Sequence, residues 1–192
     1  MCKKIKHALL LTVLLLFTPT ILAAADGNSL PMQFRVSFGG RAVEVLEENG
    51  SSILIPCLLY DSIAIRQDDE SMDLRARMED DNGKLLYTTT ITLYAGLQTA
   101  DDLDNYMKYT QAQLENRRGF QARNSDLGFI VGVLMGREII CSATFLYNDK
   151  LISITTTGYD SIAEGMNGVE KHKEILIGYN KAIEGRSSRS SK

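Results

Sequence analysis

The stretch REIICSATFLYNDKLISITTTG, residues 137–158, decides the fold. Its first half alternates, so that one set of side chains falls on a single face of a strand: Ile139, Cys141, Ala143, Phe145 and Tyr147. Asn148-Asp149-Lys150 then has the composition of a turn, and residues 151–158 return. The stretch predicts an antiparallel hairpin with one buried face.

Two more hairpins are predicted upstream. Apolar residues alternate with charged ones from Met72 to Met78, Asp80-Asp81-Asn82-Gly83 supplies a turn, and residues 85–94 return with Thr, Ile and Tyr. Before them, residues 42–46 and 53–55 flank Glu48-Asn49-Gly50, and Asn-Gly between apolar runs is typical of a hairpin. A further strand is predicted at 33–38.

Two helices complete the predicted fold, at about 99–118 and 161–183. Thr99 can cap the first, Gly119 is a natural stop, and Ser161 with Glu164 forms a capping box for the second. The fold class is therefore α+β: an antiparallel sheet built from hairpins and covered by two helices. We expect one domain over residues 26–184 and a disordered polar tail over 185–192.

The first 25 residues predict a secretory signal peptide. Three lysines among the first six residues precede an apolar run from Ala8 to Phe17, and Ala23-Ala24-Ala25 offers the small side chains of a cleavage site. An uncleaved membrane anchor is the alternative, but a span needs about 20 apolar residues, and Thr18-Pro19-Thr20 interrupts this one. We expect a soluble protein exported to the periplasm or the extracellular space, with no membrane span after cleavage.

The charge of the chain excludes one class of partner, and its cysteines allow two interpretations. After cleavage, 18 basic residues face 24 acidic ones, a net charge of −6, which does not suit binding to nucleic acid. Two cysteines remain, Cys57 and Cys141. They form a disulfide in one interpretation, because exported proteins meet oxidising conditions, and are two separate buried thiols in the other.

No residue pattern predicts catalysis, a cofactor or a metal site. His172 is the only histidine after residue 25, and we expect an ordinary surface or boundary position for it in the last helix. The acidic turn at 79–83 lacks the strongest ligands of a calcium loop, with Met78 and Thr89 at those positions. Whether the chain is an enzyme stays open, with a binding function favoured.

One pentapeptide occurs twice. Tyr-Asp-Ser-Ile-Ala fills residues 60–64 and again residues 159–163. A true repeat carries its flanking sequence with it, and here the flanks differ. We interpret the recurrence as coincidence, with a shared helix-start chemistry as the other interpretation.

The second half of the chain resembles the PsbP-like, DcrB-like α/β/α sandwich family. The resemblance covers about residues 70–183 and rests on element order and on three phrases: Leu103-Asp-Asn-Tyr106, Arg118-Gly119-Phe120 and Ala143-Thr-Phe-Leu-Tyr147. In that fold helices cover an antiparallel sheet. Its members are mostly non-enzymatic binding or assembly factors, so the resemblance implies no catalytic residues.

Three functions remain as hypotheses. The first is a non-enzymatic binding or assembly module that acts on another envelope protein or a secreted toxin, with partner contacts at Asp80, Asp81, Asp101 and Asp102. The second is a hydrolase with dispersed carboxylates and the Ser- and Thr-rich face around Thr155 to Tyr159. The third is a carrier of a small ligand or lipid, which would need a large apolar cavity.

Overall fold

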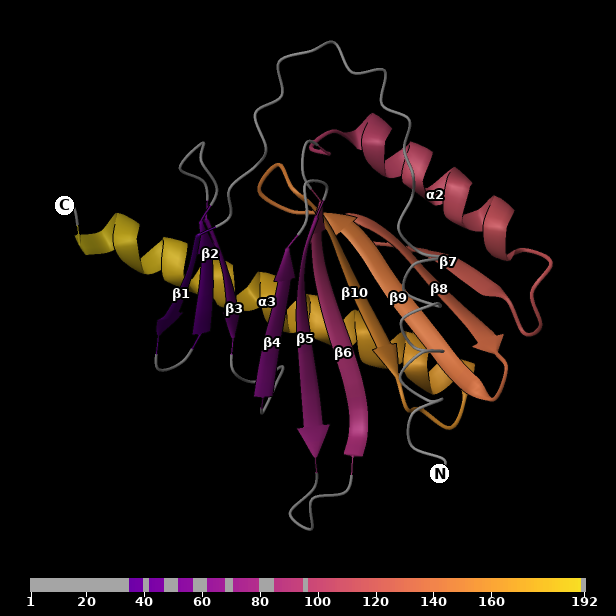
Figure 1. The fold of residues 1–192 in the computed structure, drawn as a ribbon. Helices are drawn as coiled ribbons and strands as arrows, with labels where there is room; N and C mark the ends of the chain where they lie inside the picture. The colour runs from indigo at the N-terminus through magenta and orange to yellow at the C-terminus, as the bar shows by residue number, and fades with distance from the viewer. Residues whose placement is uncertain are drawn as a thin grey trace.

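The computed structural model describes residues 35–39, 42–46, 52–56, 62–67, 71–79, 85–94 and 97–190. These residues form the predicted α+β fold (Figure 1). Its elements are β1 Arg35–Gly39, β2 Ala42–Leu46, β3 Ser52–Pro56, β4 Ser62–Gln67, β5 Ser71–Glu79, β6 Leu85–Tyr94, α2 Ala100–Leu114, β7 Gln121–Ser125, β8 Gly128–Met135, β9 Glu138–Leu146, β10 Leu151–Thr157 and α3 Ile162–Ser190.

Seven strands form one antiparallel sheet in the order β4-β5-β6-β10-β9-β8-β7. It joins two runs of consecutive hairpins, β4 to β6 and β7 to β10, along the β6–β10 pair, where Ile152 lies opposite Leu93. The predicted hairpins β2–β3, β5–β6 and β9–β10 are confirmed. Strand β4, for which we predicted no element, pairs with β5.

The β9–β10 turn shows why its sequence favours a hairpin. Tyr147 and Lys150 exchange both backbone hydrogen bonds, at 3.0 and 3.1 Å, around a two-residue loop. Asn148 and Asp149 have φ of 49° and 54°. This is the left-handed region that the tightest hairpin loops require, and Asn and Asp tolerate it better than most residues.

The remaining strands form a second sheet in the order β1-β2-β3, and α3 runs behind both sheets (Figure 1). The helix has 29 residues, so it is about 43 Å long at 1.5 Å per residue. Near its far end, Asn180 donates to the carbonyl of Leu54 at 2.8 Å and accepts from the Leu54 amide at 2.9 Å. This amide side chain imitates a neighbouring strand and occupies the edge of β3.

The two helices pack on opposite faces of the large sheet, as neighbouring residues of β8 show. Ile130 packs in a cluster with Met166 and Val169 of α3. Phe129, the preceding residue, packs in another cluster with Tyr106 of α2. Because successive side chains of a strand point to opposite faces, the arrangement is a layered one of helix, sheet and helix.

A third cluster joins the two sheets beneath α3. It contains residues from β2, β3, β5, β6, β9, β10 and α3: Val43, Val45, Ile53, Ile55, Met72, Leu74, Ile91, Leu93, Phe145, Tyr147, Ile152, Ile154, Leu176 and Ile177. Both sheets therefore share one apolar layer, and α3 covers it.

The helix ends differ from those predicted. α2 ends at Leu114 rather than 118, because the chain turns over residues 115–119 and brings Phe120 back under the helix. α3 continues to Ser190, so residues 185–190, predicted to be disordered, are helical. Extending an established helix costs far less free energy than starting one. Residues 185–190 can therefore continue the helix, although they are polar.

Small residues let α3 approach the sheet closely. A Cβ atom at Gly165 would lie 2.6 Å from the sulfur of Cys141, and one at Gly132 would lie 2.5 Å from Ile162. Gly165 weakens the helix by about 1 kcal/mol relative to alanine. Its position against Cys141 explains why alanine is not there.

We predict that Gly165→Ala destabilises the protein by about 1–3 kcal/mol, because the new methyl group overpacks the contact with Cys141. In a Cys141→Ala background the sulfur is gone, and the same change should be neutral or stabilising through helix propensity. Urea unfolding of the four variants measures this coupling. Equal effects of Gly165→Ala in both backgrounds would contradict the close contact.

A second stability prediction concerns the β7–β8 turn. Leu127 has a φ of 67° and is 52% exposed, so it combines backbone strain with little burial. Leu127→Gly should raise the free energy of unfolding by about 0.5–1 kcal/mol by removing that strain. The matched control is Gly136→Ala, where φ is +66° and no atom lies within 4 Å of a Cβ; it should cost about 1 kcal/mol. A destabilised Leu127→Gly beside the expected control would show that Leu127 makes contacts that outweigh its strain.

Candidate binding surface

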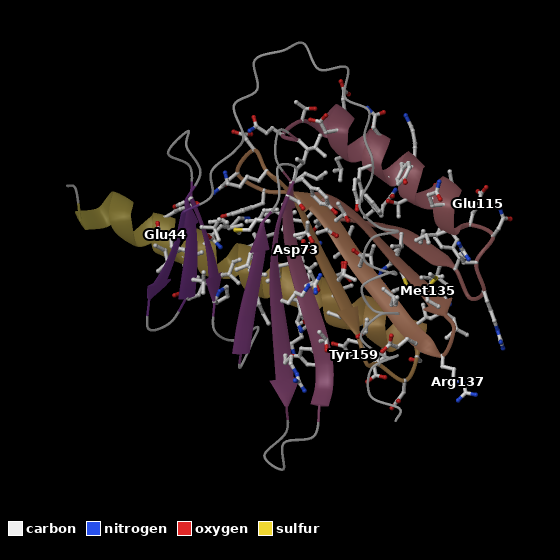
Figure 2. All side chains as sticks on the ribbon, viewed as in Figure 1. Glu44, Asp73, Glu115, Met135, Arg137 and Tyr159 are labelled. Carbon is white, nitrogen blue, oxygen red and sulfur yellow. The ribbon has the colours of Figure 1, made fainter. Side chains whose placement is uncertain are left out.

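The face of the large sheet that α3 does not cover is polar over its central strands. On β5, β6, β9 and β10 the residues that alternate with the apolar core point to this side. We call the following set the polar face: Asp73, Arg75, Thr90, Thr92, Ser142, Thr144, Ser153 and Thr155. Asp73, near the start of β5 and one strand in from the β4 edge, is labelled in Figure 2.

Strand register arranges the polar face in two rows. One row runs Asp73, Thr92, Ser153, Thr144, and the next runs Arg75, Thr90, Thr155, Ser142. Hydroxyl groups link them: Thr155 donates to Ser142 at 3.1 Å, while Ser153 lies 2.9 Å from the Ser142 oxygen and 3.1 Å from the Thr144 oxygen. The β9 and β10 part of the face is therefore satisfied within itself.

Two tyrosines border the polar face where α2 meets the sheet. The hydroxyls of Tyr94 on β6 and Tyr106 on α2 are 2.8 Å apart. Burial raises the pKa of Tyr106 to about 12, and burial together with the nearby Tyr106 raises the pKa of Tyr94 well above its ordinary value. Asp73 contributes to both shifts, so both tyrosines stay neutral hydrogen-bonding groups at physiological pH.

At the charged end of the polar face, formed by Asp73 and Arg75, two donor nitrogens lack hydrogen-bond partners among the described residues. Asp73 Oδ1 accepts a hydrogen bond from Thr92 at 2.8 Å, whereas Asp73 Oδ2 lies 4.0 Å from Arg75 Nη2. The second distance is that of a long ion pair and is too long for a hydrogen bond. Arg75 Nε and Nη2 are both covered from solvent and have no hydrogen-bond partner in the part of the chain that the structure describes.

Of the four acidic residues predicted to contact a partner, the structure describes two, Asp101 and Asp102. Asp80 and Asp81 lie outside the described residues. Asp101 is exposed at the start of α2, whereas Asp102 caps that helix by accepting from the amides of Gln98 and Thr99 at 3.0 and 2.8 Å. Burial acts to raise the pKa of Asp102, but the hydrogen bonds from Thr99 and Gln98 lower it overall. Asp102 thus has a structural role.

Of the two cysteines predicted to pair, the structure describes only Cys141. Cys141 is a fully buried free thiol whose sulfur donates a weak hydrogen bond to the carbonyl of Ile162 at 3.6 Å. Burial raises its pKa to about 11, and this does not suit a nucleophile at neutral pH. Cys57 lies outside the described residues, so the disulfide between them stays a prediction.

His172 is buried rather than at the surface or boundary as predicted, with 6% of its area exposed. Its ring lies against Tyr87, with centroids 5.1 Å apart, and its Nδ1 has no partner among the described residues. Burial, with a smaller effect from Lys171, lowers its pKa to about 4. Within residues that the structure describes, no group of three or more His, Cys, Asp or Glu is placed to hold a metal ion.

The Ser- and Thr-rich run from Thr155 to Tyr159 does not form one face. Thr155 belongs to the polar face, whereas Thr156 is buried beneath α3, opposite Thr89 on β6. Tyr159 stacks on Tyr87, with ring centroids 6.0 Å apart. The sequence alone did not show that this run pairs with the threonines of β6, because that pairing depends on the long-range β6–β10 register.

A hollow beside α2 is lined by Tyr109, Gln113, Arg117 and Met135, among others. Its volume of about 30 Å³ leaves room for a water molecule or two, not for a lipid.

Comparison with known proteins identifies no relative: no family model, curated protein or solved structure matches the chain. Among the described residues, neither helix combines the length and apolar character needed to cross a membrane.

We predict that His172 makes stability depend on pH. In the unfolded chain it titrates near 6.5, but in the folded protein only near 4. As pH falls from 6.5 towards 4 the unfolded state takes up the proton first, so the free energy of unfolding should decrease, by up to about 3 kcal/mol. Urea unfolding between pH 7.5 and 4.5 measures this.

The control for that prediction is His172→Phe, which keeps a ring beside Tyr87 but cannot ionise. Carboxylates titrate in both proteins, so the difference between the two curves isolates the histidine. Parallel curves would show that His172 is as readily protonated in the folded state as in the unfolded one.

Proposed function

We propose that the chain is an exported, non-enzymatic binding or assembly module that acts on another envelope or secreted protein, and that the polar face is its contact surface. The observation that carries the proposal is the asymmetry of the sheet. One face is closed by α3 and the apolar clusters, whereas α2 covers only part of the width of the other (Figure 1). On that second face Asp73, Arg75, Thr92 and Thr155 are partly exposed, and the remaining four residues of the polar face are buried.

Several features of the polar face suit contact with a protein. Strands β5, β6, β9 and β10 hold its hydroxyl groups at fixed spacing, and the hydrogen bonds among Ser142, Thr144, Ser153 and Thr155 stiffen one half. Polar groups held rigidly lose little entropy when a partner binds. The resemblance to the PsbP-like, DcrB-like sandwich family, whose members mostly bind or assemble other proteins, points in the same direction.

The geometry favours the alternatives less. Cys141 and His172 both lie on the α3 side with pKa values shifted away from those useful for nucleophilic or base catalysis. Asp73 is the one carboxylate among the eight described residues that define the polar face. A hydrolase with paired carboxylates would need a second one beside it. A lipid carrier needs a cavity of several hundred Å³, and the hollow beside α2, among the described residues, is too small to serve as one.

Site-specific photo-crosslinking in the cell envelope tests this proposal. A crosslinking amino acid at Thr155 of the polar face should trap one discrete partner, identified by mass spectrometry. The matched control is Glu174, which is exposed on the outer side of α3 and should trap none. A partner trapped from Glu174 alone, or no adduct from either position, would contradict the polar face as the binding surface.

A further inference from the structure

The guanidinium group of Arg75 is the one part of the polar face whose hydrogen-bonding capacity is visibly unused. Nε and Nη2 are both out of contact with solvent, and neither has an acceptor among the described residues. Leaving a buried donor unpaired destabilises the folded state, and the effect is larger for a charged group. The remainder of the side chain is accessible, with 28% of its area exposed.

We propose that Arg75 binds a carboxylate group of the partner through Nε and Nη2. This inference rests on the proposed function and names the chemistry that the polar face recognises. The two unpaired nitrogens point their hydrogens in parallel along one edge of the planar guanidinium, and that spacing matches the two oxygens of a carboxylate. Both nitrogens are covered in this structure, so binding requires the partly exposed side chain to turn this edge outward.

The neighbours of Arg75 agree with a carboxylate ligand. Thr90 lies directly across on β6 and Thr155 follows on β10, so the row offers hydroxyl groups next to the guanidinium. Asp73 and Arg77 flank Arg75 on the same face of β5, and Arg77 is exposed. This stripe carries two positive charges and one negative charge, in a chain that is acidic overall after cleavage.

Asp73 also determines where the ligand sits and limits its charge. One of its oxygens is engaged by Thr92, and its negative charge repels a second anion. The carboxylate therefore approaches from the Arg77 side. A polyanion such as nucleic acid would meet both Asp73 and the net negative charge of the chain, −3 for the full sequence. A single carboxylate, from an acidic side chain or a chain terminus of the partner, matches the two parallel donors of Arg75.

Titration with sodium acetate tests the site directly by NMR. In the protein exported and processed through its own leader, the Arg75 Nε–H resonance is assigned by its loss in Arg75→Lys. Acetate should shift this resonance saturably, with a Kd in the millimolar range, whereas sodium chloride at equal ionic strength should not. A linear shift that chloride reproduces would overturn the proposal.

Two variants sharpen the test. Arg75→Lys keeps the charge but loses the paired donors, so acetate affinity, followed through the amide of Thr90, should fall about tenfold. In Arg77→Gln, acetate should still shift the Arg75 Nε–H resonance, but it should bind with weaker affinity because one positive charge is lost. Unchanged affinity in Arg75→Lys would refute the bidentate geometry, and circular dichroism checks that each variant is folded.

Two small ligands distinguish the source of the carboxylate. N-acetylglutamate amide presents only a side-chain carboxylate, and N-acetylalanine presents only a chain terminus. Saturable binding of either supports the proposal and names the source; binding of neither, or of both only as strongly as chloride, overturns it. If crosslinking from Thr155 persists in Arg75→Gln at wild-type yield, the carboxylate site is refuted while the polar face remains the binding surface. If acetate binds but Thr155 traps no partner, the proposed function fails instead.

Discussion

The packing of α3 against the apolar side of both sheets is the contact on which the rest of the structure depends. Burying a side chain the size of Leu176 or Ile154 contributes about 1.5–3 kcal/mol, and the cluster beneath α3 contains many such residues from six strands. Because strand side chains alternate, committing one set to α3 fixes the other set on the opposite face. The polar face thus follows from the helix that covers the other side.

The same contact constrains the chemistry available to the core. α3 approaches β9 closely enough that Gly165 leaves no space for a methyl group beside Cys141. The thiol is thereby removed from water, which raises its pKa to about 11. His172, further along the helix, is dehydrated in the same way and stays neutral. Both residues that could have been catalytic are consequently packing residues.

The polar face differs from the core because not all of its hydrogen-bonding groups are paired. Its hydroxyl groups satisfy one another across β9 and β10, but Arg75 keeps two donors unpaired at a cost to stability. Proteins commonly sacrifice stability at sites where they bind something, because the ligand supplies the missing partner. The exposed and strained Leu127 is a second locally unfavourable feature, at the other end of the sheet.

Much of the local structure was determined by the sequence alone. Alternation and turn residues predicted the β2–β3, β5–β6 and β9–β10 hairpins, and capping residues predicted both helix starts: Thr99 and Asp102 form a capping box at α2, and the Ser161 oxygen accepts from the amide of Glu164 at α3. These features depend on residues close in sequence. Strand β4 was not predicted, since its short run becomes a strand only through pairing with β5.

Only the tertiary structure decided which hairpins became neighbours and what each face contains. The polar face needs the β6–β10 register, which places Thr92 beside Ser153 across 61 positions of chain. The pentapeptide shows the same limit: Ser62-Ile63-Ala64 lies in β4, whereas Ile162-Ala163 begins α3. Identical residues adopt different structures because in one place a neighbouring strand supplies the hydrogen bonds, and in the other they come from the residues that follow.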